Sequence, residues 1–194
     1  MEGKMSGTKE RMAEVFKELV CRKSFHKITI RDITKECQMT RENFYYHFRD
    51  KYDILGWIFE HEIVDNLPGE SVDFEKWIGC MVHLVLKDYK FYHKVLKDLE
   101  YRQARYYLYP IFEKRIRLWV RELFDDSIWT MREEKENFTT QFFTNAFAGY
   151  CLNYVIDHEE CNYKLVERNL QFLFHQFLNY AEDEMPKTAA FSNF

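Results

Sequence analysis

Residues 28–55 read ITIRDITKECQMTRENFYYHFRDKYDIL, and they carry more structural information than any other part of the chain. The pattern predicts two short helices joined by a tight turn, followed by the start of another helix. Phe44 and Phe48 lie one helical turn apart and suit a core. The other side of the same helix carries polar groups that suit phosphates and base edges, namely Thr40, Arg41, Asn43, Tyr45, Tyr46 and His47. This arrangement indicates DNA binding.

Helix-capping residues support this division. Thr29 precedes the first short helix, and Asp32 follows three residues later, which is the spacing of a capping box. Thr40 can cap the second helix and Asp50 the next one. Because each of these residues precedes an apolar periodic run, the pattern predicts where all three helices begin.

Apolar residues recur at helical spacing along most of the chain, which predicts an all-α fold of about nine helices. The composition agrees, because 46% of the residues are apolar while Gly and Pro number only six and three. Thr8 is expected to cap the first helix. Pro110 is expected in the first turn of its helix, where proline is tolerated. The predicted helices cover about residues 8–24, 30–37, 40–48, 50–67, 72–88, 89–101, 109–123, 137–157 and 163–182.

The charge is distributed unevenly. The whole chain has a net charge of −4, so it is not a basic nucleic-acid binder throughout. Residues 1–55 contain 12 Lys and Arg against 9 Asp and Glu, whereas residues 56–194 contain 16 against 23. A basic end on an acidic body is typical of a protein in which only one end contacts phosphate.

The five cysteines do not indicate a metal site or a disulfide framework. Their number is odd, no Cys-x-x-Cys pair occurs, and each lies in an apolar context, which favours buried free thiols in a reducing cytoplasm. His158 and Cys161 are spaced for metal ligation, but two ligands are too few. No metal and no cofactor are predicted.

Motifs of enzymes and of membrane proteins are missing from the sequence. It contains no Gly-rich phosphate loop and no nucleophile elbow, so we do not expect an enzyme. No apolar run reaches the ~18 residues of a membrane span. The first residues lack the apolar core of a signal peptide. We therefore expect a cytoplasmic protein that does not contact a membrane.

The segment 29–55 resembles the DNA-binding motif of the TetR/AcrR family of bacterial transcriptional regulators. The matches in register are Thr29, Ile33, Phe44, Tyr45, His47, Phe48, Lys51 and Leu55. Gln38 replaces the common turn glycine, so the resemblance implies positive φ there, at a cost of ~1 kcal/mol. It also implies a helix-turn-helix domain at 1–52, a helical effector-binding and dimerisation domain at 53–185, a connecting helix at about 51–66, and a flexible tail at 186–194.

The resemblance implies that some side chains contact phosphates and others contact base edges. Its chemistry makes Arg41 the best candidate to read guanine and Asn43 adenine, while Glu42 could accept from cytosine or orient Arg41. The alternative is that these side chains form an ordinary packed or solvated surface. The expected phosphate contacts are Thr29, Tyr45, Tyr46, His47 and Lys51, and the expected base-edge contacts are Arg31, Thr40, Arg41, Glu42 and Asn43.

The last two predicted helices carry apolar residues on nearly all sides, which is too many for one monomer-facing stripe. Self-association would bury the second surface, and the resemblance likewise implies a homodimer. The alternative is that these helices are central to the monomer. The residues expected at the dimer interface are Phe142, Ala146, Gly149, Tyr150, Leu170, Phe174 and Phe177.

The family resemblance also implies a pocket for a small-molecule effector. The chain is rich in aromatic residues, which could line such a pocket or simply form the core. The candidate lining residues are Trp77, Met81, Tyr92, Tyr101, Tyr107, Phe112, Trp119 and Phe147.

Together these features predict a homodimeric, effector-responsive transcriptional regulator of a palindromic operator, with repression favoured over activation. The segment 91–96 resembles the branch of the family that includes the dihydroxyacetone kinase operon activator, which makes a protein coregulator a further candidate partner. The alternative is a helical interaction or coregulator protein with a vestigial DNA-binding head. Preserved polar groups on the second short helix argue against it.

Overall fold

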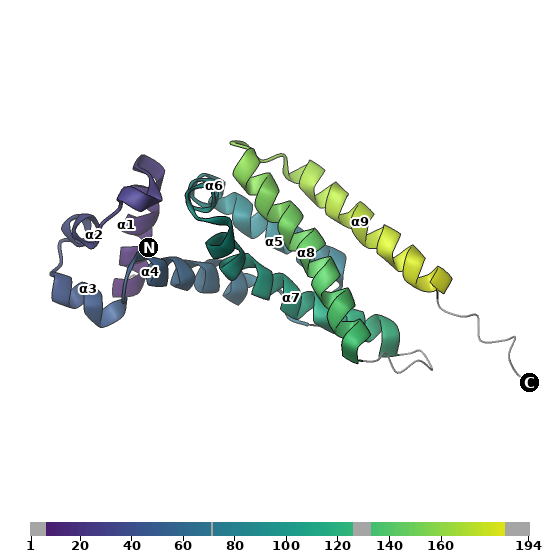
Figure 1. Cartoon of the computed structure of the whole chain (residues 1–194). Coiled ribbons are helices and arrows are strands. Elements are labelled where there is room, and N and C mark those ends of the chain that lie inside the picture. Colours follow the sequence, from purple (N-terminus) through teal and green to yellow (C-terminus); the bar gives the residue numbers. More distant parts are fainter. Residues whose placement is uncertain (1–6, 71, 126–132, 185–194) are drawn as a thin grey trace, which may run out of the picture.

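The computed structural model describes residues 7–70, 72–125 and 133–184 (Figure 1). Within these ranges the protein consists of nine α-helices with short 3₁₀ and π segments and no strand, which confirms the all-α prediction. The α-helices are α1 Thr8–Arg22, α2 Ile30–Cys37, α3 Arg41–His47, α4 Lys51–Ile58, α5 Phe74–Lys87, α6 Tyr89–Asp98, α7 Tyr101–Asp125, α8 Glu133–Asp157 and α9 Tyr163–Glu184.

Helices α1, α2 and α3 form a small head, which we define as residues 7–50. Apolar residues at helical spacing face one another across it, and burying them stabilises the three-helix arrangement. Phe44 and Phe48, predicted to lie in a core, are both buried, together with Phe16 and Leu19 of α1 and Ile33 of α2. The predicted core position of Phe44 and Phe48 is therefore confirmed.

The predicted caps of α2 and α3 are present. The Thr29 hydroxyl accepts from the Asp32 backbone N–H at 3.2 Å, and the Asp32 carboxylate accepts from the Thr29 N–H at 2.8 Å, which completes the capping box. Thr40 accepts from the Asn43 N–H in the same way. Gln38, between the helices, has φ 56° and ψ 45°, which confirms the expected left-handed turn.

The start of α1 differs from the prediction. Thr8 was expected to cap this helix, but it is the first helical residue, and Gly7 occupies the capping position without a side-chain hydrogen bond. Glycine is accepted at that position because its backbone is free to adopt the extended conformation.

Helix α4 runs from the head into the body (Figure 1). Asp50 caps it by accepting from the backbone N–H groups of residues 52 and 53. After Ile58 the helix continues as a π-turn at Phe59–Ile63 and a 3₁₀ turn at Val64–Asn66, so the helical path ends just before Pro68 as expected. The predicted domain division at 52/53 lies inside α4 and stays a prediction.

Helices α5 to α9 form the body, with α7 and α8 as an antiparallel pair and α6 beside the head (Figure 1). A cluster of aromatic rings joins α5, α7, α8 and α9. Phe74 stacks on Trp119 and on Phe174 at centroid distances of 5.0 and 4.9 Å, and its edge meets Phe147 at 5.1 Å. The large aromatic content of the sequence is therefore used mainly to pack the body.

Helix α7 corrects one sequence-based prediction. We expected a helix to begin at about residue 109, but α7 runs from Tyr101 to Asp125 with Pro110 inside it. A proline in a helix interior removes one hydrogen bond and costs about 3 kcal/mol. Burial of Ala104, Leu108 and Phe112 on both sides of the proline offsets this cost, while Pro110 itself lies on the exposed side.

Candidate nucleic-acid interface

The outer side of α3 is open to solvent. Arg41, Asn43 and Tyr45 are exposed, and Tyr46 is exposed by 84%. The Arg41 guanidinium lies 3.5 Å from the Tyr45 hydroxyl, one turn along the helix. Because Phe44 on the inner side is fully buried, the helix cannot turn these polar groups inward without exposing its core.

Further residues predicted to contact DNA lie on α2, on α3 and just before α2. Arg31, a predicted base-edge contact, is exposed in the first turn of α2, and His47, a predicted phosphate contact, is half-buried with its ring edge-on to Tyr46 at 4.9 Å. Thr29 is exposed but its hydroxyl already takes part in the capping box. The structure thus brings these groups to one end of the head, and their contacts with DNA stay a prediction.

Glu42 is exposed and its carboxylate faces the start of its own helix. The Glu42 backbone N–H and then the Thr40 hydroxyl hold its pKa below the ordinary value. A carboxylate beside unpaired N–H groups of a helix start is stabilised in its charged form. This contact with the helix start is neither of the two roles considered from the sequence, and acceptance from cytosine or orientation of Arg41 stays a prediction.

An ion pair connects α1 to α2 behind the exposed surface. The Lys23 ammonium lies 2.7 Å from the Asp32 carboxylate. Lys23, together with the hydroxyl and N–H of Thr29, lowers the pKa of Asp32 to about 2. The carboxylate that completes the capping box thus also connects the end of α1 to the start of α2.

Lys51 has a structural role that the sequence pattern did not reveal. Its ammonium donates to the backbone carbonyls of Phe25, His26 and Ile28 at 2.8, 3.2 and 3.3 Å, and it lies 4.5 Å from the centre of the Phe25 ring. Burial lowers its pKa. These carbonyls end the 3₁₀ turn between α1 and α2, so Lys51 stabilises the head from inside.

Replacing Lys51 with methionine is therefore expected to destabilise the protein as well as weaken binding to DNA of any sequence. Loss of hydrogen bonds from a charged donor should lower the free energy of unfolding by about 2 kcal/mol. Urea unfolding followed by circular dichroism would measure this. Lys35→Met, on the exposed side of α2, is the matched control. Equal stability of the two variants would contradict the structural role of Lys51.

A second polar cluster joins the head to the body. Lys17 of α1 donates to Glu62 at 2.7 Å and to Asp88, and the Tyr92 hydroxyl donates to Glu62 at 3.2 Å. Burial alone would lower the pKa of Lys17, but the hydrogen bonds to Asp88 and Glu62 raise it overall. The sequence did not reveal this cluster because its members lie 45 and 71 positions from Lys17.

The predicted effector-pocket residues occupy three different environments. Met81 and Tyr92 line an apolar cavity in the body. Tyr107 stacks on Phe59 at 5.1 Å, and Tyr101 is exposed. The remaining four are buried in the aromatic packing of the body and are Trp77, Phe112, Trp119 and Phe147. The structure does not gather the eight residues around one space, and their role toward an effector stays a prediction.

The predicted dimer residues also differ in exposure within one protomer. Phe142 is exposed, while Ala146 and Tyr150 are half-buried. Gly149 is covered by the Tyr109 hydroxyl, and a Cβ there would approach it to 3.2 Å. Leu170 and Phe174 are buried within the protomer. The side chain of Phe177 lies outside the described residues, as does the predicted tail at 186–194.

Other kinds of site were sought in the described parts of the chain. Residues 7–70, 72–125 and 133–184 contain no cluster of three or more His, Cys, Asp or Glu side chains able to hold a metal ion. Within the same ranges, no helix combines the length and hydrophobicity needed to cross a bilayer.

Comparison with known families bears directly on the head. Residues 17–56, from α1 into α4, match the family described as bacterial regulatory proteins, tetR family. Residues 17–56 are called the TetR-family domain because of this match. The match contains both helices of the helix-turn-helix and the residues that brace them, so the resemblance inferred from segment 29–55 is confirmed.

A curated relative matches part of the chain. The HTH-type dhaKLM operon transcriptional activator DhaS of Lactococcus lactis subsp. lactis (strain IL1403) is 30% identical over 70 residues. The alignment covers 36% of this chain and 37% of the relative, so the chain matches little more than a third of that protein's length.

Solved structures show that the fold is shared beyond the TetR-family domain. The dihydroxyacetone kinase operon activator DhaS has a TM-score of 0.66 at 17% identity, covering 92% of this chain and 96% of its own. A transcriptional regulator from Aquifex aeolicus VF5 has a TM-score of 0.61 at 21% identity, covering 88% and 99%. At 17% and 21% identity, these similarities concern the fold alone.

Proposed function

We propose that the protein is a homodimeric transcriptional regulator that reads a palindromic DNA operator with α3 and responds to a small-molecule effector. The observation that carries this proposal is the two-sided character of α3. Its polar side is open to solvent, and Phe44 and Phe48 hold its other side in the core of a TetR-family domain. The major groove of B-DNA admits one α-helix presented in this way.

The contacts proposed from the sequence are retained, with Arg41 and Asn43 as the main readers of bases. Both are exposed on α3, and neither side chain is needed for the core. For Lys51, the phosphate contact must share the ammonium with three carbonyls of the head. A phosphate contact by Lys51 would position the TetR-family domain on the DNA backbone but would not distinguish one base pair from another.

Dimer formation is proposed through the outer faces of α8 and α9. Phe138 and Phe142 are exposed by 69% and 58% and stack on each other, and Phe172 on α9 is exposed by 62%. The Asn169 amide donates to the Tyr150 hydroxyl at 2.8 Å and connects the two helices. Three large exposed aromatic side chains on these helices are more than a monomer surface ordinarily carries, and a second copy would cover them.

The direction of regulation is not assigned. The resemblance to the family favoured repression, but the curated relative is an activator by name. The proposal is therefore control of transcription in either direction. A vestigial head on a coregulator protein is disfavoured, because α3 keeps exposed Arg41, Asn43 and Tyr46.

Selection of bound sequences from a random DNA pool tests the central proposal. We expect enrichment of a palindrome whose half-sites are centred about 34–36 Å apart, one helical turn. Binding to that palindrome should weaken by about 10³-fold or more between roughly 50 and 200 mM salt, because several phosphates are neutralised. Failure to enrich any sequence over competitor duplex would contradict DNA reading by α3.

Replacing Arg41 with alanine is expected to lower operator affinity by about 1–3 kcal/mol and to relax base preference at one position of each half-site. A guanidinium that contacts a base edge discriminates among base pairs, whereas a phosphate contact does not. Gel shifts with the selected operator and its single-base variants would measure both effects. Arg22→Ala, at the exposed end of α1, should leave them unchanged. Unaltered operator affinity of Arg41→Ala would refute base reading by this residue.

A further inference from the structure

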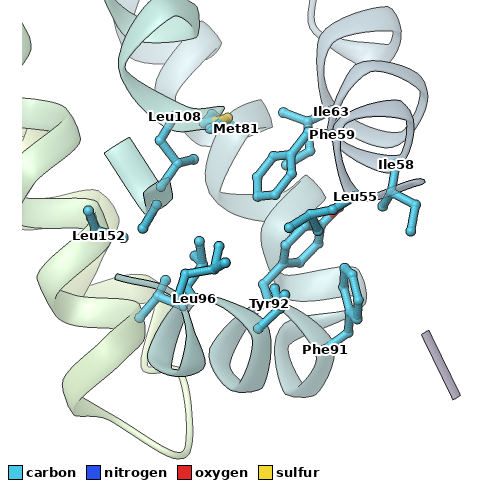
Figure 2. Packing of buried hydrophobic residues seen from close by; sticks show 14 of the residues in the cluster. Leu55, Ile58, Phe59, Ile63, Met81, Phe91, Tyr92, Leu96, Leu108 and Leu152 are labelled. Carbon is cyan, nitrogen blue, oxygen red and sulfur yellow. The ribbon is translucent and has the colours of Figure 1, made fainter. Parts of the chain in front are cut away.

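The body contains a small apolar cavity of about 40 Å³. It lies where the π-turn after α4 meets α5, α6, α7 and α8, and near the start of α9. Phe59, Met81, Tyr92, Leu96 and Leu108 are among its walls, and Figure 2 shows them around one interior region. Only Met81 and Tyr92 among these five belong to the pocket predicted from the sequence.

The chemistry of the cavity selects an uncharged, apolar occupant. Three tyrosines border it, but each hydroxyl has a protein partner: Tyr89 donates to the His158 carbonyl, Tyr92 donates to Glu62, and Tyr154 accepts from the Asn162 N–H. Burial raises the pKa of the Cys151 thiol to about 12 and also raises that of Cys161, so both are neutral. A charged ligand would lose its hydration here without gaining an ionic partner from the lining.

Two residues of the cavity lining are connected to the polar cluster around Glu62 and Lys17, which joins the body to the head. Phe59 opens the π-turn, and Glu62 in the same turn accepts from Lys17 of α1 at 2.7 Å. Tyr92 lines the cavity with its ring and donates its hydroxyl to Glu62. The rings of Phe59 and Tyr92 also touch edge-to-face at 5.4 Å. Segments of π-helix occur frequently at functional sites.

The size of the cavity connects its occupancy to movement. A cavity of roughly 150 Å³ accommodates benzene. That volume is nearly four times the volume of the cavity in this protein. A molecule with one aromatic ring can therefore enter only if the walls move apart. Phe59 lies in the same π-turn as Glu62, and the Tyr92 hydroxyl donates to Glu62. Displacement of these two side chains should therefore alter the contact of Glu62 with Lys17.

We propose that this cavity is the effector site, that it takes a small uncharged apolar molecule, and that Tyr92, Glu62 and Lys17 pass its occupancy to α1 and the DNA-binding head. This inference rests on the proposed function, because it names the class of effector and the route of regulation. Helix α6 also contacts the head through Lys94, which lies two positions after Tyr92 and donates to the Cys21 carbonyl at 2.6 Å. That hydrogen bond does not involve Glu62 or Lys17, so Lys94 supplies a matched control.

The first experiment tests the cavity and uses benzene as the probe, with benzoate as its charged counterpart. Calorimetry on the purified full chain should show a higher Tm with benzene and no change with benzoate. Val85→Phe, which places a ring in the cavity, should abolish the benzene effect. If Val85→Phe does not fold, the smaller substitution Val85→Leu replaces it and should reduce the benzene effect. Equal effects of benzene and benzoate, or no effect of either on the wild type, would overturn the assignment.

The second experiment tests the route through Glu62. For each protein, the ratio of operator affinity with and without benzene is compared, so changes in basal affinity cancel. We expect a ratio of about fivefold or more for the wild type, below about twofold for Glu62→Ala, and near the wild-type value for Lys94→Met. Similar ratios for wild type and Glu62→Ala, or equal losses in both variants, would overturn this route.

Hydrogen exchange separates failure of this inference from failure of the proposed function. Backbone amides of α1 around Lys17 should change their exchange rates when benzene is added to the wild type but not to Glu62→Ala. This readout requires no DNA. If α1 responds while no operator is found in the selection experiment, the cavity and route stand and the proposed DNA reading fails. If an operator is bound but neither α1 nor the operator affinity responds to benzene, the proposed DNA reading stands and the cavity and its route to α1 fail.

Discussion

Replacing Phe44 with alanine is expected to unfold the head and abolish operator binding while the body stays folded. Phe44 is fully buried, and its ring centre lies 6.3 Å from that of Phe48. Removing a buried phenylalanine ring costs about 3–5 kcal/mol, through lost apolar burial and the cavity left behind. A head of this small size has little stability beyond that amount.

Hydrogen exchange would report the loss of protection in α1 to α3, and a gel shift would report the loss of binding. Tyr46→Ala is the matched control, because the two residues are near neighbours on α3 and Tyr46 is 84% exposed. The control should keep the protection of the head and lose only part of the operator affinity. A folded head in Phe44→Ala would show that another part of the protein fixes the angle of α3.

Replacing Phe142 with glutamate is expected to convert the proposed dimer into monomers. The side chain is exposed in one protomer, so the substitution should barely affect folding. An anchor residue at an interface contributes about 2 kcal/mol, and a twofold axis uses it twice, so the dimer should weaken by about 4 kcal/mol or roughly 700-fold. In the proposed dimer two heads read the operator together, so affinity for the full palindrome should fall as well.

Sedimentation velocity over a range of concentrations would measure the dissociation. Tyr106→Glu changes an aromatic residue of similar exposure on α7 and should leave the dimer intact. Wild-type protein that sediments as a monomer, or equal dissociation of both variants, would contradict dimerisation through α8.

Features fixed by neighbours in the sequence were predictable. The Thr29–Asp32 capping box, the caps at Thr40 and Asp50, and the left-handed Gln38 depend on contacts within a few residues. Helical spacing placed Phe44 and Phe48 in the core for the same reason.

Features fixed by distant partners were not predictable. Lys51 has a pattern typical of a phosphate contact, but carbonyls 23 to 26 residues away occupy its ammonium. Pro110 is a valid helix start by local rules, and only packing on both sides keeps it inside α7. Trp119 and Phe147 suit a cavity as well as a core, and no local pattern shows that Phe74 contacts both rings or that Phe174 contacts Trp119.

The π-turn at Phe59–Ile63 also bears on how such proteins diverge. A π-turn is an α-helix that has gained one residue, and each residue of an α-helix turns the chain by about 100°. Deleting one residue from this turn would restore ordinary winding and rotate everything beyond it about the helix axis. Gain or loss of a single residue at this point would therefore change the orientation of the head relative to the body without altering any side chain of α3.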